Sequence, residues 1–283
     1  MVSFVTYLPL LASVVLLQLS SGAVGPLDAL SGVQLGYTPA QIGLLGSAHF
    51  LGFFIGCWWT PRLTGQVGHA RAFAALTAAG AMGLLAHMMW TNPYAWALMR
   101  VATGMCVAGC YTVIEAWLQG RLTNETRGKA MGAYRVVDLV AGLAGQAMIG
   151  VLSPASYVSY NLLAIICCAS LIPLAITTST PPTTAKALKL RPMLAWTRSP
   201  LAVAGVVVSG VSGAAFRMVG PLYGQAQGLS AELLGLFLAA FVAGGALAQF
   251  PIGWLADRFD RRRVLIALSL LSLLASAGVA LVA

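Results

Sequence analysis

The sequence predicts an all-α polytopic membrane protein with nine transmembrane helices. The first observation behind this fold class is composition: the 283 residues are 59% hydrophobic and only 8% charged, whereas a soluble domain carries about 25% charged residues. The second is a series of nine apolar runs, each about 20 residues or longer, the length that a helix needs to cross a bilayer. The chain therefore cannot hide its apolar surface in a water-soluble core, and the lipid bilayer is its predicted surrounding.

The third observation is the placement of the basic residues. Thirteen of the 16 Lys and Arg residues fall in loops on one side of the predicted membrane, and the other three lie inside apolar runs. Because cytoplasmic loops carry the excess of Lys and Arg, this side is predicted to be cytoplasmic, together with the N-terminus. The same placement accounts for the net charge of +9 without a nucleic-acid partner.

The first six spans are predicted to form an N-terminal bundle over residues 1–178. The second span has a clear start, since Thr38 and Gln41 form a capping-box pattern with Pro39 between them. Its Gly52-x-x-x-Gly56 pattern favours close approach of another helix. The six spans are expected at about 2–30, from 38, 72–90, 94–119, 128–152 and 157–177.

The next stretch, residues 179–199, is rich in Thr and Pro and is predicted to be a cytoplasmic linker. Residues 200–283 then hold three further spans, a partial C-terminal bundle. The first runs over about 200–227, the second begins after the N-cap candidate Ser230, and the third begins near Arg263. Four tryptophans fall near predicted helix ends, as an interfacial belt requires: Trp90, Trp96, Trp117 and Trp254.

An internal repeat relates the two parts. A shift of 192 residues aligns Thr38 with Ser230, Gly52 with Gly244, and the loop 61–71 with 253–263, without a gap. Both copies start on the cytoplasmic side, so the repeats are parallel. The first-copy loop lacks the charges of the second, since Gly65 stands at the Asp257 position.

The hairpin between the last two spans carries a resemblance. Its pattern is similar to the loop signature of the major facilitator superfamily, Gly-x-x-x-Asp-Arg-x-Gly-Arg-Arg, with an aspartate in place of the second glycine. Further motifs resemble the YcaD-like branch of that superfamily: Glu115-Ala-Trp117-Leu118, Arg127-Gly128, Gln249-Phe-Pro251-Ile-Gly253, Gly68-His69 and Arg100-x-x-x-Gly104. The residues of the hairpin signature are Gly253, Asp257, Arg258, Asp260, Arg261 and Arg262.

The resemblance implies the superfamily fold, truncated after the ninth of twelve helices. It also implies a monomeric secondary active transporter of a small solute in a bacterial inner membrane, coupled to protons and directed to efflux. The alternative is a non-transporting membrane remnant, in which the Gly52/Gly56 face lacks its partner. Catalytic signatures such as H-E-x-x-H, G-x-S-x-G and the Walker loop are absent from the sequence, so neither an enzyme nor a cofactor is predicted.

Charged residues inside the spans are the candidates for the substrate and proton pathway, because each costs about 2.5–3.5 kcal/mol to insert. Asp28 either carries a proton or meets water at a helix end. Arg100 either belongs to the motif that the superfamily links to proton coupling, or is a structural partner for Asp28 or a carbonyl group. His49 and His87 are interpreted as packing residues rather than proton relays.

For two further candidate residues the sequence also leaves two roles open. Glu115 is either a gate or a partner of Arg121 or Arg127. Arg217 either contacts a carboxylate or phosphate on the substrate, or pairs with an acid in a missing span.

Arg135 and Asp138 lie three residues apart, so they share a helix face and are predicted to form an intramembrane pair. The five cysteines all fall in apolar runs and are expected to be free packing thiols, with neither metal nor disulfide.

The hairpin generates a prediction. The resemblance implies that Asp257 braces the two bundles on the cytoplasmic side, against the N-terminus of the span that begins near Gly128, where its charge meets the helix dipole. Asp257→Asn should slow transport while membrane insertion, measured by the protein level in isolated membranes, stays unchanged. Unaltered transport rates in this variant would contradict a gating role.

Overall fold

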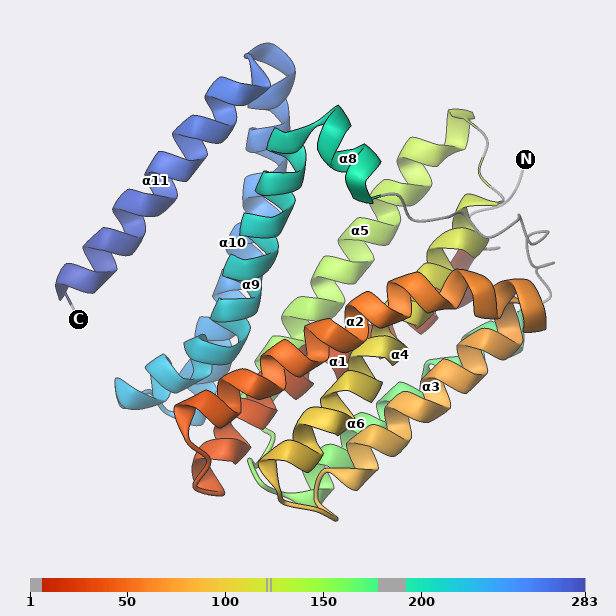
Figure 1. Cartoon of the computed structure of the whole chain (residues 1–283), viewed down its shortest axis with the longest axis vertical. Coiled ribbons are helices and arrows are strands. Elements are labelled where there is room, and N and C mark those ends of the chain that lie inside the picture. The colour runs from red at the N-terminus through yellow and green to blue at the C-terminus, as the bar shows by residue number, and fades with distance from the viewer. Residues whose placement is uncertain (1–6, 121, 123, 178–191, 283) are drawn as a thin grey trace. The chain divides into compact units, whose positions relative to one another are not determined.

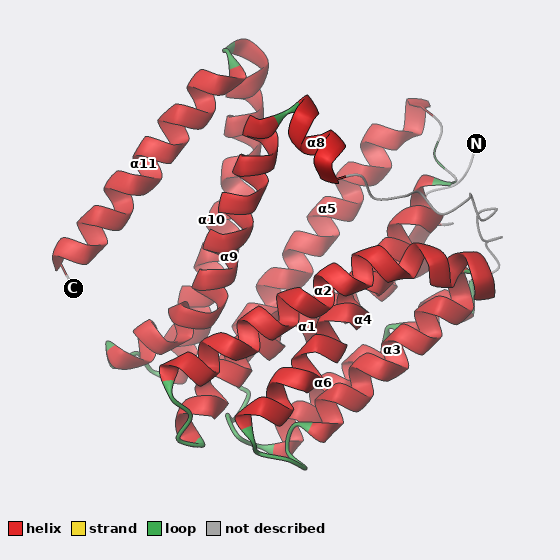
Figure 2. Ribbon diagram, viewed as in Figure 1, coloured by secondary structure: helices red, strands yellow, loops and turns green. Residues whose placement is uncertain are grey.

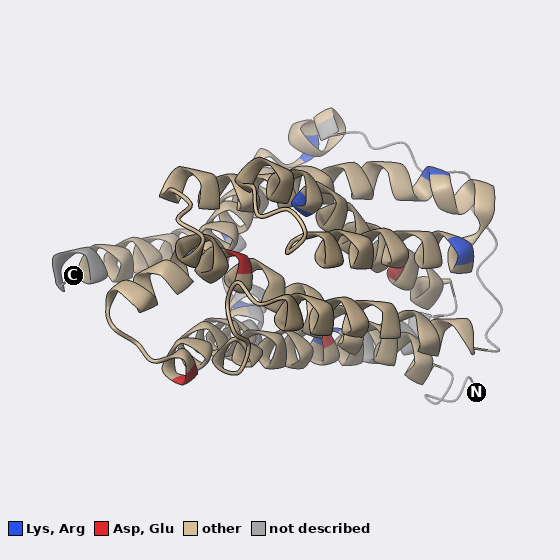
Figure 3. Cartoon of the chain, turned by 90° about the horizontal axis from the view of Figure 1, so that it is seen from below, with Lys and Arg blue, Asp and Glu red and all other residues tan. Residues whose placement is uncertain are grey.

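The structure is a computed structural model that describes residues 7–120, 122, 124–177 and 192–282. Within these ranges every regular element is a helix, and strands are absent (Figures 1 and 2). Figure 3 marks the charged residues along the helices and shows that they are few, as the composition predicts. The helices are α1 (Leu8–Gln34), α2 (Pro39–Val67), α3 (His69–Ala86), α4 (Pro93–Gln119), α5 (Asn124–Ala147), the 3₁₀ turn η2 (Met148–Gly150), α6 (Tyr157–Ala169), α7 (Leu171–Ala175), α8 (Pro192–Arg198), α9 (Pro200–Ala226), α10 (Ala231–Arg258) and α11 (Arg261–Val282).

Six helical stretches in the described part of the chain are long and apolar enough to cross a membrane. They are α1, α2, α4, residues 157–175, α9 and residues 231–248. The predicted count of nine also needs α3, α5 and α11, and this count stays a prediction. The predicted domain boundaries also stay untested. By packing, residues 1–239 form one compact unit and residues 240–283 a second, smaller one.

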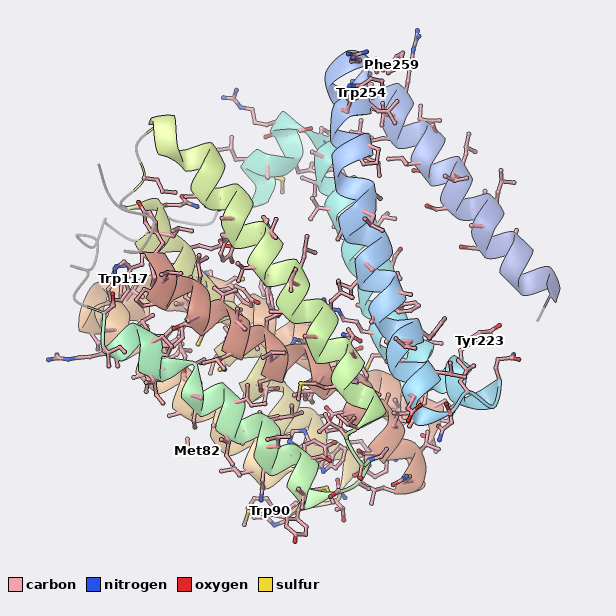
Figure 4. The ribbon with its side chains drawn as sticks, turned by 180° about the vertical axis from the view of Figure 1, so that it is seen from behind. Met82, Trp90, Trp117, Tyr223, Trp254 and Phe259 are labelled. Carbon is pink, nitrogen blue, oxygen red and sulfur yellow. The ribbon has the colours of Figure 1, made fainter. Side chains whose placement is uncertain are left out.

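The first six helices pack around a core rich in Leu, Val and aromatic side chains. α1 packs against α5 and α6, α2 against α4, and α3 against α4 and α6. The predicted position in an interfacial belt is wrong for two of the four tryptophans. Trp96 and Trp117 belong to this core, with exposures of 0% and 2%, so neither sits at a lipid interface, whereas Trp90 and Trp254 are exposed (Figure 4).

The sixth predicted span is interrupted. Its helix breaks at Ser170, which separates α6 from α7. Pro173 follows three residues later and has no backbone N–H to donate to residue 169. At the break the carbonyl oxygen of Cys167 accepts both the hydroxyl of Ser170, over 2.6 Å, and its backbone N–H, over 3.1 Å.

The α2–α4 contact depends on glycines from both helices. A Cβ atom at Gly52 would collide with the carbonyl oxygen of Val101, and one at Gly104 would collide with that of His49. At Gly56 it would lie 2.7 Å from the carbonyl oxygen of Met105. The Gly52/Gly56 face therefore has a partner, α4, and the expectation that it lacks one is wrong. The glycine of the Arg100-x-x-x-Gly104 motif serves the same close approach.

The repeat is visible in the helix boundaries. α9, α10 and α11 begin at residues 200, 231 and 261, each 192 residues after the first residues of α1, α2 and α3 at 8, 39 and 69. The turn before the second helix of each copy is also the same. Gly36 and Gly228 have φ angles of +76° and +75°, a conformation that glycine adopts without a steric cost.

The helix caps of the two copies also correspond. The hydroxyl of Thr38 accepts the backbone N–H of Gln41, and that of Ser230 accepts the N–H of Leu233. The side-chain carbonyl of Gln41 accepts the backbone N–H of Thr38 over 2.8 Å, so the predicted capping box is confirmed.

The copies differ at the start of their third helix. In the first copy the N-cap is Gly68, which has a φ angle of +85° and, as a glycine, no side chain to cap the helix. In the second, Oδ1 of Asp260 accepts the backbone N–H groups of Arg262 and Arg263 over 2.9 and 3.2 Å. Asp260 is thus an N-cap, which explains how the hairpin can carry an aspartate in place of the second glycine of the loop signature that it resembles.

Two glycines of α2 provide a test of the α2–α4 contact. Gly52→Val should lower the stability of the purified protein by about 1–3 kcal/mol or more, because overpacking forces the two backbones apart. Gly43→Val is the matched control, since a Cβ atom there meets nothing within 4 Å. The measurement is the thermal midpoint in detergent. Equal midpoints for the two variants would contradict the proposed contact.

Candidate functional site

A buried charged cluster lies where α1, α3, α4 and α6 meet. Asp28 of α1 has an exposure of 0% and Arg100 of α4 one of 4%. Nε of Arg100 lies 3.2 Å from Oδ2 of Asp28, an ion pair whose angle falls short of a hydrogen bond. The hydroxyl of Tyr160, in α6, donates a hydrogen bond to Oδ1 over 2.7 Å. Opposite charges so close stabilise each other strongly where water is excluded.

His87, directly after α3, adds an aromatic wall to this cluster. Its Nδ1 lies 2.6 Å from the carbonyl oxygen of Gly83, and since a carbonyl only accepts, Nδ1 carries the proton. Nε2 faces Oδ1 of Asp28 at 3.7 Å. The His87 ring stacks on Tyr160 with 5.1 Å between centroids, and the indole N–H of Trp96 donates to the His87 carbonyl oxygen over 2.7 Å. The acid is therefore enclosed by groups that fix its orientation.

One interpretation of Asp28 is excluded by this geometry. The residue does not meet water at a helix end, because α1 continues through Pro26 to Gln34 and buries the side chain completely. Arg100 pairs with Asp28, as one of its two interpretations expects. A part in proton coupling for either residue stays a prediction. His87 packs against aromatic rings, yet it also faces the carboxylate, so packing alone does not describe it.

A polar cavity of about 540 Å³ lies beside this cluster, between α1, α2, α4, α5 and α9. Four predicted site residues line it: Glu115, Arg217 and the pair Arg135–Asp138. Phe50, Phe53 and Val107 supply apolar lining. The other polar side chains of the wall are Gln18, Ser21, His49, Tyr111, Thr112, Tyr134 and Ser209.

The acids of the cavity are already engaged. Asp138 forms the predicted pair with Arg135, with 3.7 Å between Oδ2 and Nη1. Arg135 is 62% exposed, so this pair is only weakly stabilising. The hydroxyl of Tyr111 lies 2.7 Å from both Oδ1 of Asp138 and Oε1 of Gln18. These contacts link α1, α4 and α5.

Glu115 accepts a hydrogen bond from the hydroxyl of Tyr134 over 2.9 Å. Its alternative partners, Arg121 and Arg127, lie outside the described side chains. Arg217 has no acidic side chain within ion-pair distance among the described residues. Nδ1 of His49 likewise has no hydrogen-bond partner within the described structure.

The hairpin residues belong to the smaller unit. The guanidinium of Arg258 lies over the ring of Trp254, 4.3 Å from its centroid, and Asp260 caps α11. Trp254 and Phe259 lie at the turn between α10 and α11 (Figure 4). Arg262 is exposed. The side chains of Asp257 and Arg261, as well as Gly253, lie outside the described part, so their predicted gating role stays untested.

Sequence reasoning missed four polar residues of these sites: Gln18, Tyr111, Tyr134 and Tyr160. Each sits in an otherwise apolar run, and a buried hydroxyl or amide needs a hydrogen-bond partner. That signal was present in the sequence. However, tyrosine is also common as a packing residue, and only the three-dimensional arrangement brings the hydroxyls to Asp28, Glu115 and Asp138. Among the described residues no group of His, Cys, Asp and Glu could hold a metal ion, and all five cysteines are free thiols.

Comparison of the sequence with known protein families decides the family. The sequence profile of the Major Facilitator Superfamily matches residues 9–283. The chain belongs to this superfamily. Among its curated relatives is the MFS-type transporter YcaD of Escherichia fergusonii, 28% identical over 227 residues, which are 80% of this chain and 59% of the relative. The chain thus spans about 59% of the length of that relative.

Two solved structures show the same fold. A bacterial homologue of the human lysosomal transporter Spinster, inward-facing and unoccupied, superposes with a TM-score of 0.73 at 16% identity, covering 91% of this chain and 63% of the other. A D-xylose–proton symporter gives a TM-score of 0.60 at 16% identity, covering 92% and 70%. As a member of the superfamily, this chain is a multi-pass membrane protein of a transporter family and not of an enzyme family. Its described regular elements are all helices. The bacterial relatives agree with the predicted inner-membrane location.

The buried pair generates a double-mutant prediction. Asp28→Asn should destabilise the protein by about 3–5 kcal/mol, because it leaves the Arg100 charge buried without its partner. Asp28→Asn combined with Arg100→Gln should cost much less than the sum of the two single changes. The measurement is the thermal midpoint of each variant in detergent.

The exposed pair provides the comparison. The same cycle with Arg135→Gln and Asp138→Asn should give a coupling of about 1 kcal/mol or less, since water screens an exposed pair. A coupling at Asp28–Arg100 no larger than this would show that the buried pair does not hold the helices together.

Proposed function

We propose that this chain mediates secondary active transport of a small solute by alternating access, with protons as the coupling ion and efflux as the direction. Membership of the superfamily supports a transport role. The observation that carries the proposal is the polar cavity between α1, α2, α4, α5 and α9. Its volume of about 540 Å³ lies in the range of about 300–1,000 Å³ typical of small-molecule sites.

The composition of the cavity wall supports a site for a polar solute. Charged residues inside a membrane domain are costly and usually face the protein interior or a water-filled space. Glu115, Asp138 and Arg217 all come from helices that cross the predicted membrane, and all line the cavity. Apolar lining from Phe50 and Phe53 would hold the remainder of the solute.

The buried cluster supports proton coupling. An acid whose charge is stabilised by Arg100 loses that stabilisation if α1 and α4 shift within the N-terminal bundle during the cycle, and protonation then offsets the cost of the unpaired charge. Asp28 and Arg100 sit on two different helices, α1 and α4. A protein of the same fold is a D-xylose–proton symporter, and the Arg100-x-x-x-Gly104 pattern resembles the motif of proton-coupled drug antiporters, which favours efflux.

In the proposed cycle the two bundles rock about the cavity, and the hairpin residues close the cytoplasmic side. The N-terminus then lies in the cytoplasm, and a single chain forms the transport unit. This part of the proposal rests on the distribution of basic residues and on the hairpin signature.

A flux assay tests the proposal. The chain, and a version extended by three further spans, would be reconstituted into liposomes that contain the pH dye pyranine. A panel of small metabolites is then added outside. At least one solute should change the internal pH, and Asp28→Asn should abolish that change while Arg62→Gln, an exposed α2 residue outside the cavity, retains it.

Two outcomes would contradict the proposal. Solute-dependent pH changes with the extended chain only would identify this chain as a non-transporting remnant. Solute uptake without any pH change in either chain would contradict proton coupling and leave transport itself standing.

A further inference from the structure

The charges of the cavity are unevenly matched. Both acids in its wall have partners, since Glu115 accepts from Tyr134 and Asp138 contacts Arg135 and Tyr111. Arg217 has no acidic partner among the described residues. Among the described residues, Arg217 and Glu115 therefore both lack an ionic partner, because a hydroxyl donor does not neutralise a carboxylate, and the end of the cavity at Arg217 has a local excess of positive charge.

The surroundings of Arg217 make the local imbalance larger. A small pocket of about 20 Å³ is lined by Ser21, His49, Arg100 and Arg217, enough room for one water molecule. Ser21, His49 and Arg217 also line the large cavity, so the pocket adjoins it. At this end two guanidinium groups and an imidazole come together.

Arg100 contributes positive charge to this end although it pairs with Asp28. Asp28 lies on the far side, because it lines neither the small pocket nor the large cavity. A Cβ atom at Gly25 would lie 4.0 Å from Nη2 of Arg100 and 3.2 Å from Cε of Met218. The guanidinium thus extends from Asp28 toward α9, the helix that carries Arg217.

Resting on the proposed transport function, we propose that the solute carries an anionic group, a carboxylate or a phosphate, which Arg217 and His49 bind at the end of the cavity next to Arg100. The planar guanidinium of Arg217 matches the two oxygens of such a group. His49 lines both spaces, and a nitrogen of its ring supplies a further donor when it carries a proton. Phe50 and Phe53 line the same cavity and accommodate an apolar body.

Charged thiol reagents measure the potential at this end of the cavity. Ala214 lines both spaces and lies three residues before Arg217 on the same face of α9, so Ala214→Cys places a reporter there. Cys57→Ser and Cys168→Ser remove the two native thiols that are not buried. The full-length chain in detergent then reacts with a negatively charged sulfonatoethyl and a positively charged trimethylammonioethyl methanethiosulfonate.

For each reagent, the rate of reaction with the cysteine at position 214 is divided by the rate of reaction with free 2-mercaptoethanol. The anionic reagent should react faster than the cationic one. Arg217→Gln should lower the ratio of the anionic to the cationic rate by roughly tenfold, which corresponds to about 1.4 kcal/mol. Arg62→Gln removes a cation outside the cavity and should leave the ratio unchanged. Benzoate should slow the reaction more than benzamide does, and only while Arg217 is present.

A ratio that favours the cationic reagent, or that does not respond to Arg217→Gln, would overturn the proposal. Equal protection by benzoate and benzamide, or none by either, would also overturn it. A thiol at position 214 that reacts with neither reagent would mean that the cavity holds no water. That result would contradict the transport site itself, and it is thereby distinguished from a failure of the anion-binding proposal alone.

Discussion

The N-terminal bundle depends on the contact between Asp28 and Arg100. Neither charge could lie alone in a membrane interior, since each costs about 2.5–3.5 kcal/mol to insert without a partner. Their pairing ties α1 to α4, Tyr160 adds α6, and His87 adds the end of α3. The polar contacts of one carboxylate thus come from α4, from α6 and from the end of α3. In a bilayer, where lipid competes equally for apolar side chains, such contacts specify which helices are neighbours.

Close backbone approach is the second constraint. Gly52 and Gly104 bring α2 and α4 together so tightly that a methyl group at either position would overlap a carbonyl oxygen. The contact holds α2, which carries His49, against α4, which carries Arg100, Tyr111 and Glu115. Packing at the glycines therefore sets the width of the cavity. The turn at Gly36, repeated at Gly228, fixes how the chain enters α2 and α10.

The sequence was sufficient for the fold class, because apolar length and charge placement obey strong physical rules in membranes. Helix starts at Thr38 and Ser230 followed from capping chemistry, and the repeat followed from spacing. The site was harder. Spacing within one helix predicted the Arg135–Asp138 contact, but nothing in the order of residues says that Tyr160 reaches Asp28, 132 residues away. Burial of Trp96 and Trp117 was likewise hidden, since a tryptophan near a helix end suits both an interface and a core.

Tyr111 shows how such a wall can respond to an occupant. Its hydroxyl has one hydrogen and lies equally close to an amide oxygen on α1 and a carboxylate oxygen on α5. Only one of them can receive that hydrogen at a time. A solute that donates to the carboxylate of Asp138 frees the hydroxyl to donate to Gln18. A solute that donates to the amide oxygen of Gln18 leaves the hydroxyl to donate to Asp138. The hydrogen-bonding groups of a bound solute thus decide, through rotation of a single O–H bond, whether Tyr111 donates to α1 or to α5.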